Sequence, residues 1–157
     1  MTIKKIISGG QTGADQAGLD AAIKHNIPHG GAIPKGRPTE DGVLPEKYHL
    51  EEMTTKSYPK RTEKNVIDSD GTVVFTHGTL RGGSLLTRKN ALEHGKPTLL
   101  LNLSKMSMDE AVDLLDSFIK DNKIEVLNVA GSRASKDPEI YDKTFEVVEK
   151  YILKHHK

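Results

Sequence analysis

Three glycine-rich segments carry the residues of this chain that are best suited to bind a small molecule. They span residues 8–15 (SGGQTGAD), 76–84 (THGTLRGGS) and 128–135 (NVAGSRAS). Each follows an apolar run and precedes a helical pattern, which predicts a turn between a strand and a helix. Glycine lets the backbone approach a ligand closely, and the following helix directs free N–H groups and partial positive charge towards it. The pattern therefore predicts a site for a small molecule with an anionic group.

The first turn combines its glycines with three polar side chains. Its order does not make the G-x-G-x-x-G fingerprint of dinucleotide-binding proteins, and it lacks the Lys-Ser/Thr pair of a P-loop. Tight packing accounts equally well for one such turn, whereas three turns at one edge of a sheet favour a binding site. Asp15 is the one well-placed candidate for a catalytic acid or base. The candidate ligand-binding residues of this turn are Gly9, Gly10, Gln11, Thr12, Gly13 and Asp15.

The second and third turns add hydroxyl groups and cations. Backbone N–H groups and hydroxyls suit a phosphate or carboxylate, and a guanidinium adds charge-assisted hydrogen bonds. Arg133 is therefore the best single candidate for an anion ligand, and Arg81 stands beside the second turn. His77 suits an acid or base, or alternatively a hydrogen-bonded loop histidine. The candidate ligand-binding residues are Gly82, Gly83, Ser84 and Thr87 in and after the second turn, and Gly131, Ser132 and Arg133 in the third.

Residues 29–60 form a long segment rich in glycine, proline and charged residues. A loop of this length is uncommon inside a compact domain unless it is functional or disordered. Five apolar residues predict that it packs against the body of the protein: Ile33, Val43, Leu44, Tyr48 and Leu50. Lys35 and Arg37 flank a glycine, which suits either a mobile lid that brings two cations to the anion site or a solvated turn.

Strands and helices that position these turns alternate along the chain. Apolar runs predict strands at residues 3–7, 72–75, 98–103 and 124–129. Helical spacing predicts helices near residues 17–26, 62–67, 85–95, 107–119 and 137–152. Because parallel neighbours need crossover connections, this order predicts an α/β fold, a Rossmann-like and largely parallel sheet with helices on both faces. We expect residues 1–157 to form a single domain.

Composition argues against several classes of function. The formal net charge is +1 and tryptophan is absent, so the chain lacks the charge and the stacking rings typical of nucleic-acid binding. It has no cysteine and no histidine spacing typical of a ligand set, so no metal site is expected. No apolar stretch of ~20 residues suits a membrane span. We therefore expect a cytoplasmic protein that binds neither nucleic acid nor membrane. The sequence leaves open whether it forms a homo-oligomer.

Several strings in a fixed order resemble a known family. GGQTGAD, LDAA, PKGRPTEDG, NVIDSDGTVVF, GTLRGGSLLT and NVAGSR together resemble the putative molybdenum carrier family over nearly the whole chain. That family is similar in fold to molybdenum cofactor carrier proteins and belongs to a Rossmann-like group that includes lysine-decarboxylase-like phosphoribohydrolases. The chain resembles a circularly permuted branch, in which the AGSR strand near the end corresponds to the opening strand of unpermuted members.

The resemblance implies that the three turns bind a ligand. It implies a binding protein for a phosphate-bearing pterin or nucleotide-like small molecule, with molybdenum cofactor (molybdopterin) as the named candidate. The alternative is a hydrolase or transferase that acts on a nucleotide-derived substrate. The phosphoribohydrolases carry a glutamate in the motif P-G-G-x-G-T-x-x-E, whereas residues 81–87 (RGGSLLT) have none at the matching place, which argues against hydrolysis by that route.

Overall fold

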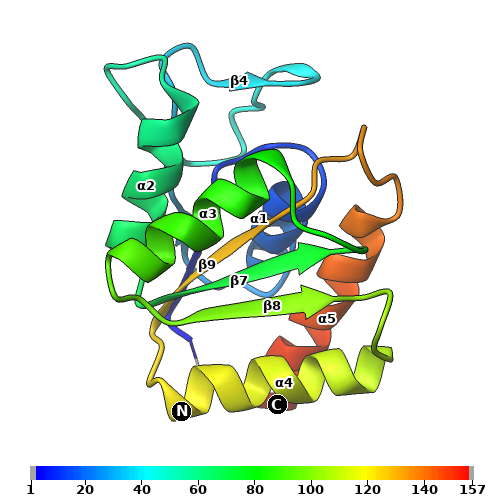
Figure 1. Ribbon diagram of the computed structural model, residues 1–157. Coiled ribbons are helices and arrows are strands. Elements are labelled where there is room, and N and C mark those ends of the chain that lie inside the picture. The colour runs from blue at the N-terminus through cyan, green and yellow to red at the C-terminus, as the bar shows by residue number, and fades with distance from the viewer. Residues whose placement is uncertain (1–2, 156–157) are drawn as a thin grey trace.

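A five-stranded parallel sheet forms the centre of the molecule (Figure 1). The computed structural model describes residues 3–155. The strands lie in the order β2-β1-β9-β7-β8, and every neighbouring pair is parallel. They are β1 (Lys5–Ile7), β2 (His29–Gly30), β7 (Gly71–Thr76), β8 (Thr98–Asn102) and β9 (Val126–Gly131). The expected Rossmann-like α/β fold is confirmed.

Helices cover both faces of this sheet (Figure 1). On one face α5 (Ile140–His155) packs against both α1 (Ala14–Lys24) and α4 (Met108–Asp121). On the other face α2 (Tyr58–Asp68) packs against α3 (Gly82–Glu93). Within residues 3–155, no helix combines the length and the apolar character that crossing a bilayer requires.

The central strand β7 separates two apolar layers. All six of its residues are buried, as expected of a parallel strand that is covered on both faces. Val73 and Phe75 belong to the large core shared with α1, α4 and α5, whereas Val74 packs with Leu80 and Ala130 on the opposite side. Both faces of β7 are therefore packed in the core. The last residue of the strand, Thr76, leads directly into the second glycine turn.

The long segment after β2 packs against the body, as its apolar residues predict. Four of the five predicted residues are buried beside Leu19 of α1, namely Ile33, Leu44, Tyr48 and Leu50. Val43 is the exception, because it lies in a hairpin and is 72% exposed. That hairpin consists of β4 (Pro38–Thr39) and β5 (Gly42–Val43), whereas β3 (Ala32–Ile33) and β6 (Glu51–Glu52) form a separate parallel pair.

Capping residues decide where two of the helices begin. Ser107 caps α4 as expected and forms a reciprocal capping box with Glu110. Ser57 caps α2 by accepting a 3.2 Å hydrogen bond from the backbone N–H of Lys60, and a proline lies in the first turn. α2 therefore starts at Tyr58 rather than near Thr62, so its first turn includes Arg61.

Candidate functional site

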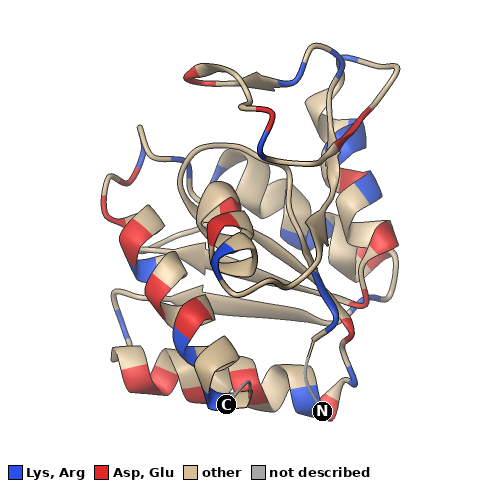
Figure 2. Cartoon of the chain, turned by 180° about the vertical axis from the view of Figure 1, so that it is seen from behind, with Lys and Arg blue, Asp and Glu red and all other residues tan. Residues whose placement is uncertain are grey.

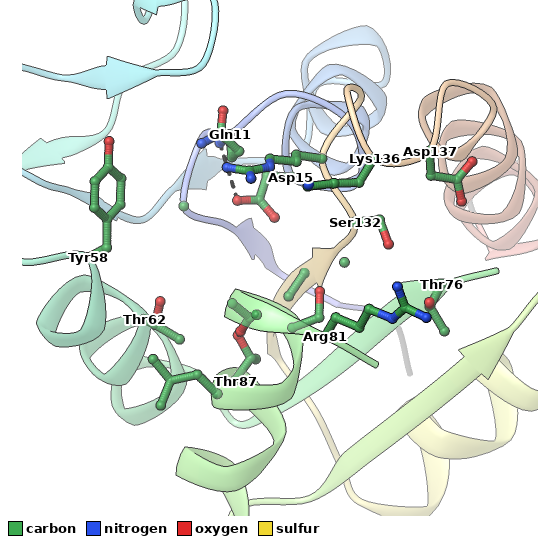
Figure 3. Close-up of a pocket in the computed structure, with 18 of the residues that line it drawn as sticks. Gln11, Asp15, Tyr58, Thr62, Thr76, Arg81, Thr87, Ser132, Lys136 and Asp137 are labelled. Carbon is green, nitrogen blue, oxygen red and sulfur yellow. Dashed lines mark hydrogen bonds between the residues drawn. The ribbon is translucent and has the colours of Figure 1, made fainter. Parts of the chain in front are cut away.

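A cavity of about 1250 Å³ lies where β1, β9 and β7 end, and all three glycine turns line it. This volume exceeds the roughly 300–1,000 Å³ that is usual for small-molecule pockets, so the cavity has room for a cofactor-sized ligand. Figure 3 shows side chains from several of these segments around one space. Ten of the predicted site residues line the cavity: Gly9, Gln11, Asp15, Gly82, Gly83, Ser84, Thr87, Gly131, Ser132 and Arg133.

Two glycines allow the turns to approach each other closely. A Cβ on Gly13, whose φ is 83°, would lie 2.4 Å from the carbonyl oxygen of Ser132. A Cβ on Gly131 would lie 2.3 Å from the carbonyl oxygen of Phe75, and this oxygen accepts a 3.2 Å hydrogen bond from Ser132 N–H. The third turn therefore packs closely against both the first turn and the end of β7.

Three predicted residues of the first turn lie behind the cavity wall. A Cβ on Gly10 would meet Leu44 and Leu50 of the long segment at 3.0 Å, so this glycine faces apolar packing. Gly13 lies where the first turn crosses the third turn. Thr12 Oγ1 accepts a 3.1 Å hydrogen bond from the backbone N–H of Ala134. Their contacts hold the turns together, and they do not reach the cavity as the sequence pattern led us to expect.

Arg61 is a site residue that the sequence reasoning missed. It is 8% exposed, and its Nη1 donates a 2.6 Å hydrogen bond to the carbonyl oxygen of Gly9. Its guanidinium also lies 5.5 Å from the ring centroid of Tyr58, which lines the cavity as well. The predicted helix began too late to include this turn. The Ser-Tyr-Pro sequence at residues 57–59, a cap followed by a proline, was the available signal.

Asp15 lies in the first turn of α1 and faces the cavity (Figure 3). Burial raises the pKa of its carboxyl group to about 6, although the positive charge of Arg61 and hydrogen bonds from backbone N–H groups oppose this shift. One of these bonds, 3.2 Å long, joins Gln11 N–H to Oδ2 of Asp15. A carboxyl group that titrates near pH 6 can donate or accept a proton under mild conditions.

His77 and Asp137 form a pair at the cavity. Nδ1 of His77 lies 2.5 Å from Oδ2 of Asp137, and both residues line the cavity. The carboxylate favours the tautomer with the proton on Nδ1, which leaves Nε2 with its lone pair. Asp137 thus supplies the orienting partner that a histidine base requires, and the same contact also suits the structural role that the sequence left open.

Lys35 and Arg37 do not reach the cavity. Nη2 of Arg37 donates hydrogen bonds to the carbonyl oxygens of Pro45 and Tyr48 at 3.0 and 2.9 Å, and to that of Leu44 at 3.4 Å. Lys35 is exposed, and its backbone N–H bonds to Thr55. Neither cation of the lid considered as one alternative lines the cavity in this structure. Arg37 instead organises the carbonyl groups of residues 44–48, and the part of the long segment at the cavity is its hairpin, through Thr39 and Glu40.

Arg133 lines the cavity, but it is also paired. Its Nε lies 3.5 Å from Oε1 of Glu40, and the Arg133 side chain is 48% exposed. Glu40 also accepts hydrogen bonds from Ser135 and Thr12. Partial burial alone would raise the pKa of Glu40, but these donors and the charge of Arg133 hold that pKa below its ordinary value.

Two cations at the cavity have no such partner. Within residues 3–155, no carboxylate lies within 4.0 Å of the charged nitrogens of Arg81 or Lys136, whereas Arg133 and His77 are paired with Glu40 and Asp137. Arg81 precedes Gly82 and Gly83 at the start of α3, where the first helical N–H groups lack intrahelical acceptors. This part of the wall therefore offers positive charge and hydrogen-bond donors to an anion. Among residues 3–155, no three His, Asp or Glu side chains are grouped so that they could hold a metal ion.

Comparisons with known proteins agree with the resemblance seen in the sequence. The model of the circularly permutated YpsA SLOG family matches residues 6–152. A crystal structure at 1.45 Å of a putative molybdenum carrier protein from Syntrophus aciditrophicus SB is similar, with 55% sequence identity and a TM-score of 0.94. The similarity covers 96% of this chain and 95% of that one. A comparison with curated proteins finds no match.

Proposed function

The chain belongs to the circularly permutated YpsA SLOG family, and on that premise we propose that its cavity binds a phosphate-bearing small molecule of the pterin or nucleotide-like class. One observation carries this proposal. Arg81 and Lys136 line the cavity without a carboxylate partner in the described chain, and Arg81 lies beside the N–H groups that open α3. An anionic ligand would neutralise these cations, and a phosphate group at the start of α3 would accept hydrogen bonds from its N–H groups.

The rest of the wall suits a flat heterocycle attached to that phosphate. Tyr58 offers one aromatic face, and Asn65 and Asn128 add amide groups at the cavity, although each already has a partner in the protein. Molybdenum cofactor is our named candidate for the cargo. Its phosphate would face Arg81 and Lys136, and its pterin would lie towards α2. The molybdenum carrier name of the similar protein supports this candidate.

Mass spectrometry of small molecules released from the protein tests this proposal. The protein is purified natively under anaerobic conditions and then denatured, and the released compounds are identified. We expect a phosphate-bearing pterin or nucleotide in amounts close to the protein concentration. Calorimetry with AMP and a pterin phosphate then measures the affinity of the emptied protein. A protein that releases no such compound and binds neither probe would contradict the proposal.

A second candidate function rests on the His77–Asp137 pair. In a hydrolase for nucleotide-derived phosphate esters, Nε2 of His77 would accept a proton from water while the water oxygen bonds to phosphorus. The ester oxygen would then leave and take a proton from solvent. Asp137 would orient the imidazole and stabilise its charged form, as carboxylates do in other histidine bases.

Phosphate release from nucleoside monophosphates separates the two functions. If the protein is a hydrolase, His77→Gln abolishes turnover, Asp137→Asn lowers it, and both variants still bind substrate. If the protein is a carrier, the wild type releases no phosphate from a ligand that it binds. The absence of turnover with a bound nucleoside monophosphate would therefore remove this second candidate.

A further inference from the structure

The carboxylate of Glu40 is held by hydrogen-bond donors from two different turns. Oε2 accepts a 3.0 Å hydrogen bond from Ser135 N–H, and Oε1 accepts a 2.6 Å bond from Ser135 Oγ. The Thr12 hydroxyl donates to Oε2, and Nε of Arg133 lies 3.5 Å from Oε1. The two oxygens thus receive a backbone N–H, two hydroxyls and a guanidinium, which is the donor set of a phosphate site.

The Thr12 hydroxyl and the backbone of the third turn are held in place by contacts other than those to Glu40. Thr12 Oγ1 is held by the N–H of Ala134 at 3.1 Å, and the N–H of Ala14 donates a 3.1 Å hydrogen bond to the carbonyl oxygen of Ser132. Both contacts join the first turn directly to the third turn. If the Glu40 carboxylate left, the Thr12 hydroxyl and the Ser135 N–H would therefore remain together at the edge of the cavity.

The hairpin that carries Glu40, residues 38–43, is attached to the body at its two ends. At its base the buried Leu44 donates through its N–H to the carbonyl oxygen of Arg37 at 2.8 Å. At its tip, besides the carboxylate contacts, the N–H of Glu40 donates to Oε1 of Gln11 at 2.9 Å. The hairpin lies at the top of the molecule in Figure 2, where its acidic tip is red. Release of the tip therefore leaves the buried anchors of the segment in place.

We propose that Thr12, Arg133 and Ser135 form an oxyanion subsite at the edge of the cavity, covered by Glu40, and that Glu40 is its internal occupant, which an anionic group of the ligand displaces. The 38–43 hairpin then acts as a latch, closed by Glu40 without ligand and released when a phosphate takes the place of the carboxylate. This inference rests on the proposed function in one respect, because it assumes an anionic ligand. It adds a second anion position to that of Arg81 and Lys136.

Competition with Glu40 has a measurable consequence. While the carboxylate occupies the subsite, only the open fraction of the protein can bind an anion there, so the apparent affinity is reduced by that fraction. Removing the charge of Glu40 should increase the affinity for inorganic phosphate by about tenfold or more, since the closed state loses its main stabilising contact. A ligand without an anionic group at this position should leave the latch closed.

Phosphate titration of charge variants tests the subsite. We compare wild type, Glu40→Gln and the control Asp41→Asn, which removes the same charge from the same exposed tip. Glu40→Gln should bind phosphate at least tenfold more tightly than wild type, and Asp41→Asn should stay within twofold of it. Adding Ser135→Ala to Glu40→Gln should remove the gain. Thermal melts confirm that each variant is folded, and Glu40→Ala serves as a second variant that also frees the donors.

Hydrogen exchange reports on the latch directly. Saturating phosphate should speed amide exchange in residues 38–43 of the wild type, whereas Glu40→Gln should exchange fast without phosphate. Equal gains in Glu40→Gln and Asp41→Asn would show a general charge effect and overturn the subsite. Phosphate that binds the wild type without faster exchange of the hairpin would overturn the displacement. AMP binding that depends on Arg81 and Lys136 but not on Glu40 would retain the proposed function and reject only this inference.

Discussion

Nη1 of Arg61 donates a 2.6 Å hydrogen bond to the carbonyl oxygen of Gly9, and this contact joins α2 to the first glycine turn. The same guanidinium lies over the α-carbon of Gly9, where an added Cβ would be 2.6 Å from Nη1. It also opposes the rise in the pKa of Asp15. Arg61 therefore links the stability of the first turn to the ionisation of the carboxyl group at the cavity.

We first predict that Gly9→Ala destabilises the protein. The new methyl group must displace the buried guanidinium of Arg61, and overpacking of this kind costs about 1–3 kcal/mol. The measurement is the free energy of unfolding in urea. Gly83→Ala is the control, because nothing lies within 4 Å of a Cβ at that position. Equal stability of Gly9→Ala and wild type would show that Arg61 moves aside without cost.

A second prediction concerns the dependence of stability on pH. The pKa of Asp15 is raised from 3.8 to about 6 in the folded protein, so the folded state binds this proton more tightly than the unfolded state does. The resulting stabilisation is complete below the unfolded pKa and is lost as pH rises through the folded pKa. Asp15→Asn should therefore be more stable than wild type at pH 8, and this difference should disappear near pH 4.

Urea denaturation of both proteins across that pH range checks this prediction. NMR titration of the Asp15 carboxyl carbon gives the pKa directly. In the variant Arg61→Gln that pKa should rise further, because the opposing positive charge is lost. A pKa for Asp15 near that of an exposed aspartate in the wild type would contradict both expectations.

A third prediction concerns the two cations without carboxylate partners. Arg81→Gln combined with Lys136→Gln should weaken the binding of AMP or a pterin phosphate by about tenfold or more, equivalent to about 1.4 kcal/mol. Calorimetry at two salt concentrations measures this loss, and the affinity of the wild type should fall as salt rises. The matched control is Arg88→Gln with Lys89→Gln, which removes the same charge from exposed positions of α3 outside the cavity. Similar losses in both double variants would place the phosphate elsewhere.

The fourth prediction compares two glycines: Gly83 leaves space for the ligand, whereas Gly95 adopts a positive φ. Gly83 lines the cavity with open space around its α-carbon, and positive φ occurs at its neighbour Gly82. Gly83→Val should therefore fold and yet block the ligand. Gly95 has a φ of 65° after α3 and lies outside the cavity, so Gly95→Ala should lower stability by about 1–2 kcal/mol and leave affinity intact. Tight binding by a folded Gly83→Val protein would remove the second turn from the site.

Local sequence patterns predicted the three turns and the edge of the sheet that they share. Strand, glycine turn and helix follow one another locally, and parallel strands bring their carboxyl ends to one edge, so the lining by Asp15, Ser84 and Ser132 could be predicted. The pattern could not distinguish a glycine at the cavity from one that lets two turns cross. Gly9 and Gly13 belong to the same glycine-rich turn. Only the close approach of Gly13 to Ser132 shows that Gly13 lets two turns cross.

The charged side chains that meet at this edge could not be predicted from local patterns, because they come from segments far apart in the sequence. Arg61 contacts a residue 52 positions away, and Glu40 contacts one 95 positions away. Hydrogen bonds of this kind depend on how the long segment and α2 pack against the sheet, and no local spacing encodes that. Arg37, which was considered as part of a lid, is another residue whose contacts no local pattern predicts. Carbonyl groups from residues 44–50 surround the guanidinium of Arg37, and this arrangement exists only once the segment has folded around it.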